Sequence, residues 1–259
     1  MKVMDTYVPR EYLALKINYC RQQLEQLPPI RLGKITVNGT QTFLIKVGDH
    51  RHQVGSKTGK KYYQLWRQRD ELERELQFYE AQWRLKYCGP VPEIEFPKVV
   101  HSILTAYNTP VAMDKDFFDS LPNDANKDHP KPPYYFYNGI YYRSAAERSI
   151  AVFYTEAGIP FKYEPALMLA GLSKPVFPDF VPYFREINSC KIHEHLGMMN
   201  SSDYIRDSKV KFGNYTNAGL LQDLDFIFTY GDSNTALDPR FLSAKINAMI
   251  MGSVVCAVK

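Results

Sequence analysis

The order of helical and extended patterns in the second half of the chain constrains the fold most. Residues 144–158 predict a helix, because Ser144 is a good N-cap, Gly158 a good C-cap, and the apolar residues between them share a stripe. Beyond it we expect strands over 161–169 and on both sides of the polar turn 185–189, a helix over 202–218, a strand over 224–231 and a helix over 238–250. This α-β-β-β-α-β-α order predicts an α/β fold with a mixed sheet.

The first part of the chain predicts a smaller module of its own. Apolar residues follow helical spacing over 9–27, and Pro28 with Pro29 stops the helix there. Asn38-Gly39 lies between β-branched residues and is the dipeptide most typical of a two-residue hairpin turn. A second helix is expected over 61–87, where one apolar stripe runs among charges, as in a packing arm or a short coiled coil.

Breaker residues divide the chain. The segment 88–97 is rich in Pro and Gly and indicates a boundary, whereas 122–139 is a polar, proline-rich stretch. Between them, 98–121 suggests short helical pieces. We therefore expect a helix-hairpin-helix module over 1–90, a connector with short helices over 91–141, and the α/β core over 142–259.

Composition narrows the class of protein. A chain of 259 residues with 45% hydrophobic content is long enough to build a proper core, and its net charge of +4 is only a mild bias towards anionic partners. The four cysteines form no CxxC pair, which argues against a structural zinc site and a disulfide framework. No segment approaches the roughly 20 apolar residues of a membrane span. We expect a cytoplasmic protein without a membrane partner.

Basic residues gather between the expected hairpin and the start of the second helix. They are Lys46, Arg51, Lys57, Lys60, Lys61, Arg67 and Arg69. Two interpretations remain open at this point: a patch that contacts phosphates, or an ordinary solvated turn and helix face.

Two acids interrupt apolar strands, Asp179 and Glu194. If 185–189 is the hairpin turn, the two residues stand nearly opposite each other. Glu194 then shares a face with Ile192, whereas His193 and His195 point to the other face, which argues against a zinc site built from these three. Facing carboxylates repel each other, and a hard cation such as Mg²⁺ or Mn²⁺ bound between them would remove this repulsion. Two alternatives need no metal: both acids reach water at an exposed hairpin end, or an acid pairs with a Lys or Arg of the core.

Glu147 is a third candidate, because it lies on the apolar stripe of the helix over 144–158. A competing interpretation needs no chemistry. Ser144-x-x-Glu147 is also a capping box, in which the glutamate accepts a hydrogen bond from the N-cap amide.

Four segments in order, RSAAERSIA, GIPFKYE, PDF and HEHLGMM, resemble the PD-(D/E)XK nuclease superfamily. In particular, they resemble a group of bacterial proteins whose third strand ends in E-H-x-G-M-M. The resemblance covers about 142–250, and the N-terminal helix-hairpin-helix region resembles what precedes the core in that group. It implies a restriction-endonuclease-like core and metal-dependent hydrolysis of phosphodiester bonds, of DNA rather than RNA.

The resemblance also implies roles for particular residues. Asp179 and Glu194 would bind Mg²⁺ or Mn²⁺, and Glu147 would be the helical acid of the superfamily. One departure stands out, since Leu196 occupies the place of the motif lysine. The resemblance implies that Lys211 or Lys209 on the next helix replaces it, and Lys211 is preferred because its position matches a lysine expected in the related group. Lys211 shares a helix face with Tyr204 and Tyr215, whereas Lys209 lies on the adjacent stripe. The alternative is that both are ordinary surface lysines.

A competing class keeps the fold without the chemistry. Such a protein would bind nucleic acid, or act as a subunit of a larger assembly, without cutting. The charged N-terminal helices would then serve as the contact to a second copy or to another protein.

Overall fold

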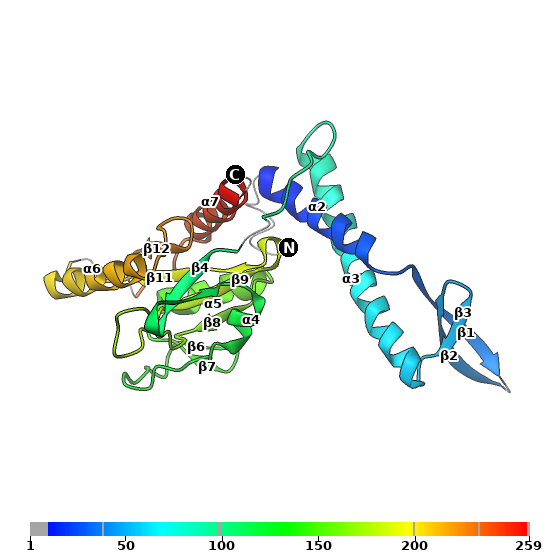
Figure 1. The fold of residues 1–259 in the computed structure, drawn as a ribbon, viewed down its shortest axis with the longest axis horizontal. Coiled ribbons are helices and arrows are strands. Elements are labelled where there is room, and N and C mark those ends of the chain that lie inside the picture. The colour runs from blue at the N-terminus through cyan, green and yellow to red at the C-terminus, as the bar shows by residue number, and fades with distance from the viewer. Residues whose placement is uncertain (1–9, 38, 98–99, 199, 233, 258–259) are drawn as a thin grey trace. The chain divides into compact units, whose positions relative to one another are not determined.

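The computed structural model describes residues 10–37, 39–97, 100–198, 200–232 and 234–257 (Figure 1). The chain forms two compact units, one from Arg10 to Ile94 and a second that begins at Glu95. No helix in the described ranges is both long and apolar enough to cross a membrane. Cys20, Cys88 and Cys190 form no disulfide bond, and the side chain of Cys256 lies outside the described residues.

The N-terminal unit contains the expected helices and hairpin and one further strand. Its elements are α2 (Arg10–Gln26), β1 (Ile30–Val37), β2 (Thr40–Val47), β3 (His50–Gln53) and α3 (Lys57–Lys86). The strands form one antiparallel sheet in the order β1-β2-β3, and α2 packs along α3. Helix α3 begins at Lys57 rather than near residue 61, because Ser56 accepts a hydrogen bond from the amide of Gly59 at 3.0 Å and caps it.

The turn between β1 and β2 has the predicted length. Val37 pairs with Thr40, which leaves two residues in the loop, and Gly39 has a φ of +78° that suits glycine. Asn38, the other residue of the predicted dipeptide, lies outside the described residues. The loop length fixes the register of the whole ladder, down to Ile30 opposite Val47.

The segment expected to connect the two parts, 91–141, instead contributes to the core of the second unit. Helical pieces were expected over 98–121, but much of this segment is a hairpin of β4 (Ser102–Thr105) and β5 (Thr109–Ala112), followed by α4 (Lys115–Ser120). Ile103 and Phe118 are buried in the same cluster as Ile192. A second short hairpin, β6 (Phe136–Tyr137) with β7 (Ile140–Tyr141), lies just before the expected core.

The rest of the second unit is a mixed α/β structure that follows the predicted α-β-β-β-α-β-α order, with one short strand added at the end of the expected turn. Its helices are α5 (Ala145–Glu156), α6 (Ser202–Asn217) and α7 (Pro239–Ala257), and its strands are β8 (Phe161–Tyr163), β9 (Phe180–Phe184), β10 (Ser189–Cys190), β11 (Ile192–Leu196) and β12 (Phe226–Tyr230). Strand β9 is antiparallel to β8 and β11, whereas β11 runs parallel to β12. Strand β8 is shorter than expected, since Glu164 adopts a φ of +41° and ends it.

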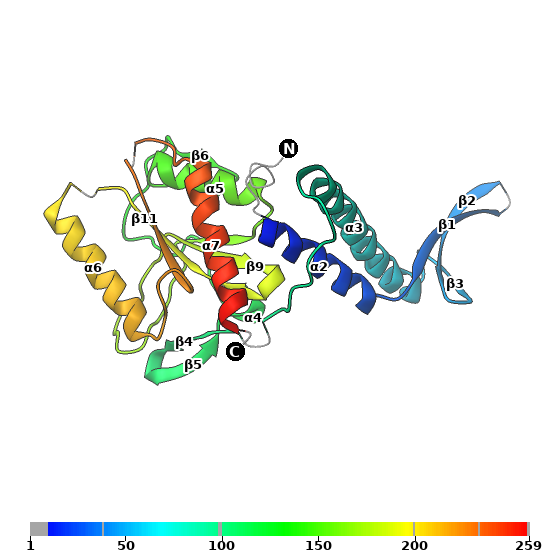
Figure 2. The same cartoon turned by 90° about the horizontal axis from the view of Figure 1, so that it is seen from above.

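Helices α5 and α6 cover opposite faces of this sheet. On α5, the hydroxyl of Tyr154 lies 2.9 Å from Nδ1 of His193. On α6, the ring of Tyr215 packs against Phe226, which pairs with Ile192. Ile192 and His193 are consecutive in β11, and consecutive strand residues point to opposite faces. Figure 2 shows α6 and α7 on opposite sides of β11.

Candidate active site

Asp179 and Glu194 stand at facing positions, as the hairpin register predicted. Phe180 on β9 pairs with His193 on β11, so the next positions on the two antiparallel strands are Asp179 and Glu194. Oδ2 of Asp179 accepts a hydrogen bond from the backbone amide of His195 at 2.7 Å. This bond fixes one oxygen of Asp179 at the point where β9 begins.

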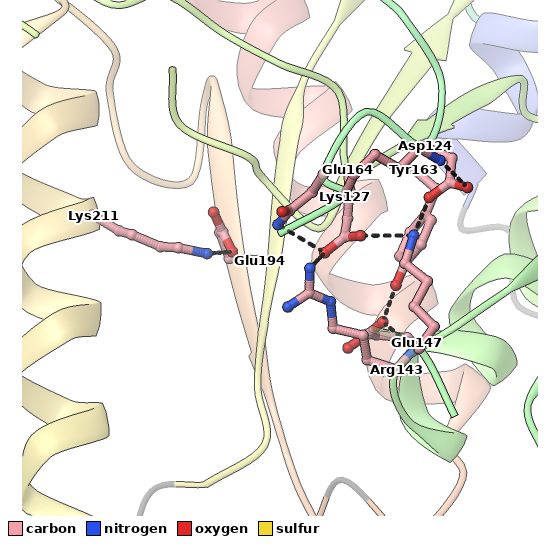
Figure 3. Close-up of polar contacts among 10 residues, drawn as sticks. Asp124, Lys127, Arg143, Glu147, Tyr163, Glu164, Glu194 and Lys211 are labelled. Carbon is pink, nitrogen blue, oxygen red and sulfur yellow. Dashed lines mark hydrogen bonds and ion pairs between the residues drawn. The ribbon is translucent and has the colours of Figure 1, made fainter. Parts of the chain in front are cut away.

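Glu194 is buried and bonded to two side chains of α6. It is 1% exposed, and its Oε2 accepts a hydrogen bond from Nζ of Lys211 at 2.8 Å (Figure 3). Its Oε1 accepts a short hydrogen bond from the hydroxyl of Tyr215. Lys211 and Tyr215 are four residues apart and therefore lie on one helix face. Lys211 thus reaches the acid expected for it, whereas Lys209 is exposed.

The end of β11 is held by the same helix. The hydroxyl of Tyr204 donates to the carbonyl of His195 at 3.3 Å and accepts from the amide of Gly197 at 3.2 Å. Tyr204 and Tyr215 share the predicted face with Lys211 but had not been assigned a part in the site. Their spacing was the signal that could have identified them.

Glu147 is fixed by two hydrogen bonds to one of its oxygens. The hydroxyl of Tyr163 donates to Oε2 of Glu147 at 2.6 Å, and the amide of Arg143 donates to the same atom at 3.1 Å (Figure 3). The predicted capping box is therefore only half present. Ser144 does accept from the amide of Glu147 at 3.0 Å, but the glutamate bonds one residue before the N-cap instead of at it.

Asp179 couples these two glutamates electrostatically. Burial raises the pKa of Glu194 to about 7, with Lys211 opposing the rise and Asp179 adding to it. Burial, followed by the charge of Asp179, raises the pKa of Glu147 to about 7 as well. Burial alone would lower the pKa of Lys211, but Glu194 and Asp179 more than offset this and hold it above the usual value of a lysine. Asp179 therefore adds to the rise that burial causes in both glutamates.

Oxygen donors at this centre fit a hard divalent cation. Among the described residues, no group of three or more His, Cys, Asp and Glu side chains lies close enough to hold a metal ion. Asp179 and Glu194 make a two-carboxylate set, and Oδ1 of Asp179 has no hydrogen-bond partner in the described part of the chain. Such ligands suit Mg²⁺ or Mn²⁺, and a cation would offset the charge of Asp179, which adds to the rise in both glutamate pKa values. To bind such a cation, Oε2 of Glu194 would have to give up its hydrogen bond from Lys211 or accept it together with the metal.

The two histidines of HEH point away from Glu194, as the strand alternation predicted. His193 is bonded through Nδ1 to Tyr154 and through Nε2 to the hydroxyl of Thr229 at 2.8 Å, and burial lowers its pKa to about 3. Nδ1 of His195 lies 3.0 Å from the same hydroxyl. The ring of His195 lines a pocket of about 290 Å³ together with Tyr230 and Phe241. Both rings lie on the α5 side of the sheet, and burial lowers the pKa of each.

A buried ion network behind Tyr163 was not predicted from the sequence. Glu164 is 3% exposed and is paired with Nη2 of Arg143 at 2.5 Å (Figure 3). It is also paired with Nζ of Lys131 at 2.9 Å. Lys131 also bonds to Asp124 and lies 4.4 Å from the centre of the Tyr163 ring. The network braces the tyrosine that holds Glu147, and two of its members, Asp124 and Lys131, come from the segment expected to be a connector.

No protein-family model, curated protein or solved structure matches this chain. The resemblance of residues 142–250 to the PD-(D/E)XK nucleases therefore stays a prediction. What supports a function is the chain's own geometry. It brings together Asp179, which directly precedes β9, Glu194 of β11 and Lys211 of α6.

Proposed function

We propose that the second unit is a metal-dependent nuclease with a restriction-endonuclease-like core, and that it hydrolyses phosphodiester bonds, of DNA in preference to RNA. The observation that carries the proposal is the 2.8 Å hydrogen bond from Lys211 to the buried Glu194, beside the facing Asp179. A carboxylate pair with one lysine is the side-chain set that the superfamily needs. The strand arrangement, with β9 antiparallel to β11 and β11 parallel to β12, supports the same core.

Asp179 and Glu194 would hold the Mg²⁺ or Mn²⁺ ion. When bound, the ion would activate a water molecule and neutralise charge that grows on the scissile phosphate. Each remaining role belongs to a side chain. Nζ of Lys211 is a cation with three donors, so one can stay on Glu194 while another binds a phosphate oxygen or the attacking water.

The other residues keep the carboxylates in place. Tyr215 fixes Oε1 of Glu194, so the buried acid keeps one orientation when Lys211 turns towards the substrate. Tyr163 and the amide of Arg143 fix Oε2 of Glu147 and leave its Oε1 to bind a water molecule. Fixed acceptors of this kind need little rearrangement when the substrate arrives.

One observation favours the competing function. Both oxygens of Glu194 already have partners, Lys211 and Tyr215, so the pair is satisfied without any ion. In that case the protein would bind nucleic acid without cutting, or work as a subunit that contacts a second copy or another protein through its N-terminal helices.

The test is cleavage of a panel of single- and double-stranded DNA and RNA by the full chain, with Mg²⁺, with Mn²⁺ or with EDTA. The proposal predicts cutting with Mg²⁺ or Mn²⁺ and none with EDTA. Salt-sensitive binding without cutting under any of these conditions would replace it with the competing function. Cutting that continues in EDTA would remove the metal from the proposal.

A further inference from the structure

The N-terminal sheet has a row of three cations on one face. Arg31 on β1 pairs with Lys46 on β2, and Lys46 pairs with Arg51 on β3, so the three residues stand side by side across the sheet. All three are exposed, and none forms an ion pair within the described residues. We propose that this row, the Arg31–Lys46–Arg51 row, binds the phosphate backbone of a nucleic acid.

The row lies on the face of the sheet that is turned away from α3. Ile30 and Ile45 are buried on the side that packs against the helix, and Arg31 and Lys46 follow them directly in the sequence. Residues that alternate along a strand point to opposite faces, so the cations project outwards. The ring of His52, which neighbours Arg51, stacks on Tyr62 of α3 at 5.4 Å and marks the inner face.

Such a row is unfavourable for the free protein. Neighbouring strands lie about 4.7–4.9 Å apart, so three positive charges fall within roughly 10 Å of one another. Like charges directly opposite each other in a sheet are destabilising. An anion that lies over the row offsets this repulsion, and a phosphate of a nucleic-acid backbone provides that charge.

The sequence around the Arg31–Lys46–Arg51 row is also rich in basic residues and poor in acidic ones. Asp49 is the only acid between residues 30 and 69. The lysines and arginines of that range are Arg31, Lys34, Lys46, Arg51, Lys57, Lys60, Lys61, Arg67 and Arg69. Arg69 is not counted among the cations available to a phosphate, because its guanidinium donates to the carbonyls of Leu24 and Leu27 at 3.2 Å and pairs with Glu73. The rest have no carboxylate partner in the described part of the chain.

This inference rests on the nucleic-acid substrate of the proposed function, but not on cleavage. Binding is therefore measured with the full chain in EDTA, on duplex and single-stranded DNA, over a range of salt concentrations. The test variant is Arg31→Gln with Lys46→Gln and Arg51→Gln. The matched control combines Arg74→Gln, Arg84→Gln and Lys86→Gln, which removes the same charge from the C-terminal half of α3.

Each phosphate contact contributes about 0.9 to the slope of log affinity against log salt for duplex DNA. The row variant should lose about 2–3 from that slope and bind roughly tenfold or more weakly at physiological salt, whereas the control keeps most of its slope. Equal losses of affinity and salt slope in both variants would mean a general effect of net charge and would contradict the proposal that the Arg31–Lys46–Arg51 row binds phosphates. Unchanged DNA binding by the row variant would contradict the proposal too. So would tight binding of the wild type to anionic lipid vesicles with no binding to DNA.

A second variant separates binding from folding. Lys46→Glu places a carboxylate between two arginines, so it should raise Tm while it weakens DNA binding. A structural role for Lys46 would instead lower Tm and binding together, and that result would contradict the inference. DNA binding by the wild type with no cleavage under any metal condition would overturn the proposed function but would still support DNA binding by the Arg31–Lys46–Arg51 row.

Discussion

Lys211 on α6 bonds to Glu194 on β11, with Nζ 2.8 Å from Oε2, although seventeen residues separate them in the sequence. Leu196 stands where the strand would otherwise supply a lysine. The helix therefore brings to the acid the cation that the strand lacks. This relationship makes Lys211 the first residue to test.

Replacing Lys211 should slow cleavage strongly, with little change in DNA binding. Lys211→Met removes the donor proposed to bind the phosphate or the water, and losing one such donor costs about 10²–10³ in kcat. The measurement is the initial rate of cleavage with Mg²⁺. Lys209→Met is the matched control, two residues away and exposed, and should cut at the wild-type rate. The reverse ranking of the two variants would refute the role given to Lys211.

Tyr215→Phe should destabilise the protein. The variant leaves Oε1 of a buried carboxylate without its donor, and an unsatisfied buried acceptor costs about 1–3 kcal/mol. Urea unfolding measures the loss. Tyr107→Phe is a suitable control, since Tyr107 is 98% exposed and should show no change. Equal stability of the two variants would mean that the bond to Glu194 contributes nothing.

Tyr163 acts through Glu147 and is a positioning residue. Tyr163→Phe removes the 2.6 Å bond to Oε2, so the glutamate should lose its fixed orientation, and kcat should fall while KM stays nearly constant. Glu147→Gln should lower kcat as well. If both act through the same carboxylate, the double variant should be little worse than Glu147→Gln alone. Fully additive losses would contradict the coupling.

Asp124 should make stability depend on pH in the acid range. Burial raises its pKa, but the bonds from Lys131 and Lys127 more than offset this and hold the pKa below the usual 3.8. The stabilisation is therefore complete above about pH 4 and is lost as the pH falls through the lower folded-state pKa. Wild type should exceed Asp124→Asn in unfolding free energy at pH 7, and the difference should shrink towards pH 3. A difference that is constant from pH 7 to pH 3 would contradict this assignment.

Sequence patterns predicted the parts of the site that follow from local periodicity. The turn over 185–189 placed Asp179 opposite Glu194, and strand alternation placed His193 on the other face. Helical spacing put Lys211 on the face that carries Tyr215. Each of these depends only on the period of one element or on the length of one turn.

Elements defined by distant partners could not be predicted in this way. Strand β3 has the polar sequence of His50–Gln53, and it is a strand because it pairs with β2. Hairpin β4–β5 is likewise fixed by packing of Ile103 in the core of its unit. The ion network joins Lys131 to Glu164 across 33 residues of chain, and no local signal links the two. Tertiary contacts decide all three.

The most direct test of the central claim compares wild type with Asp179→Asn, which removes the charge that faces Glu194 and keeps the size of the side chain. Cleavage of the best DNA substrate is measured with Mg²⁺, and binding of the same DNA is measured in EDTA. We predict that the variant binds like wild type and does not cut. Cleavage by Asp179→Asn at the wild-type rate would contradict a metal-dependent active site at this pair of acids.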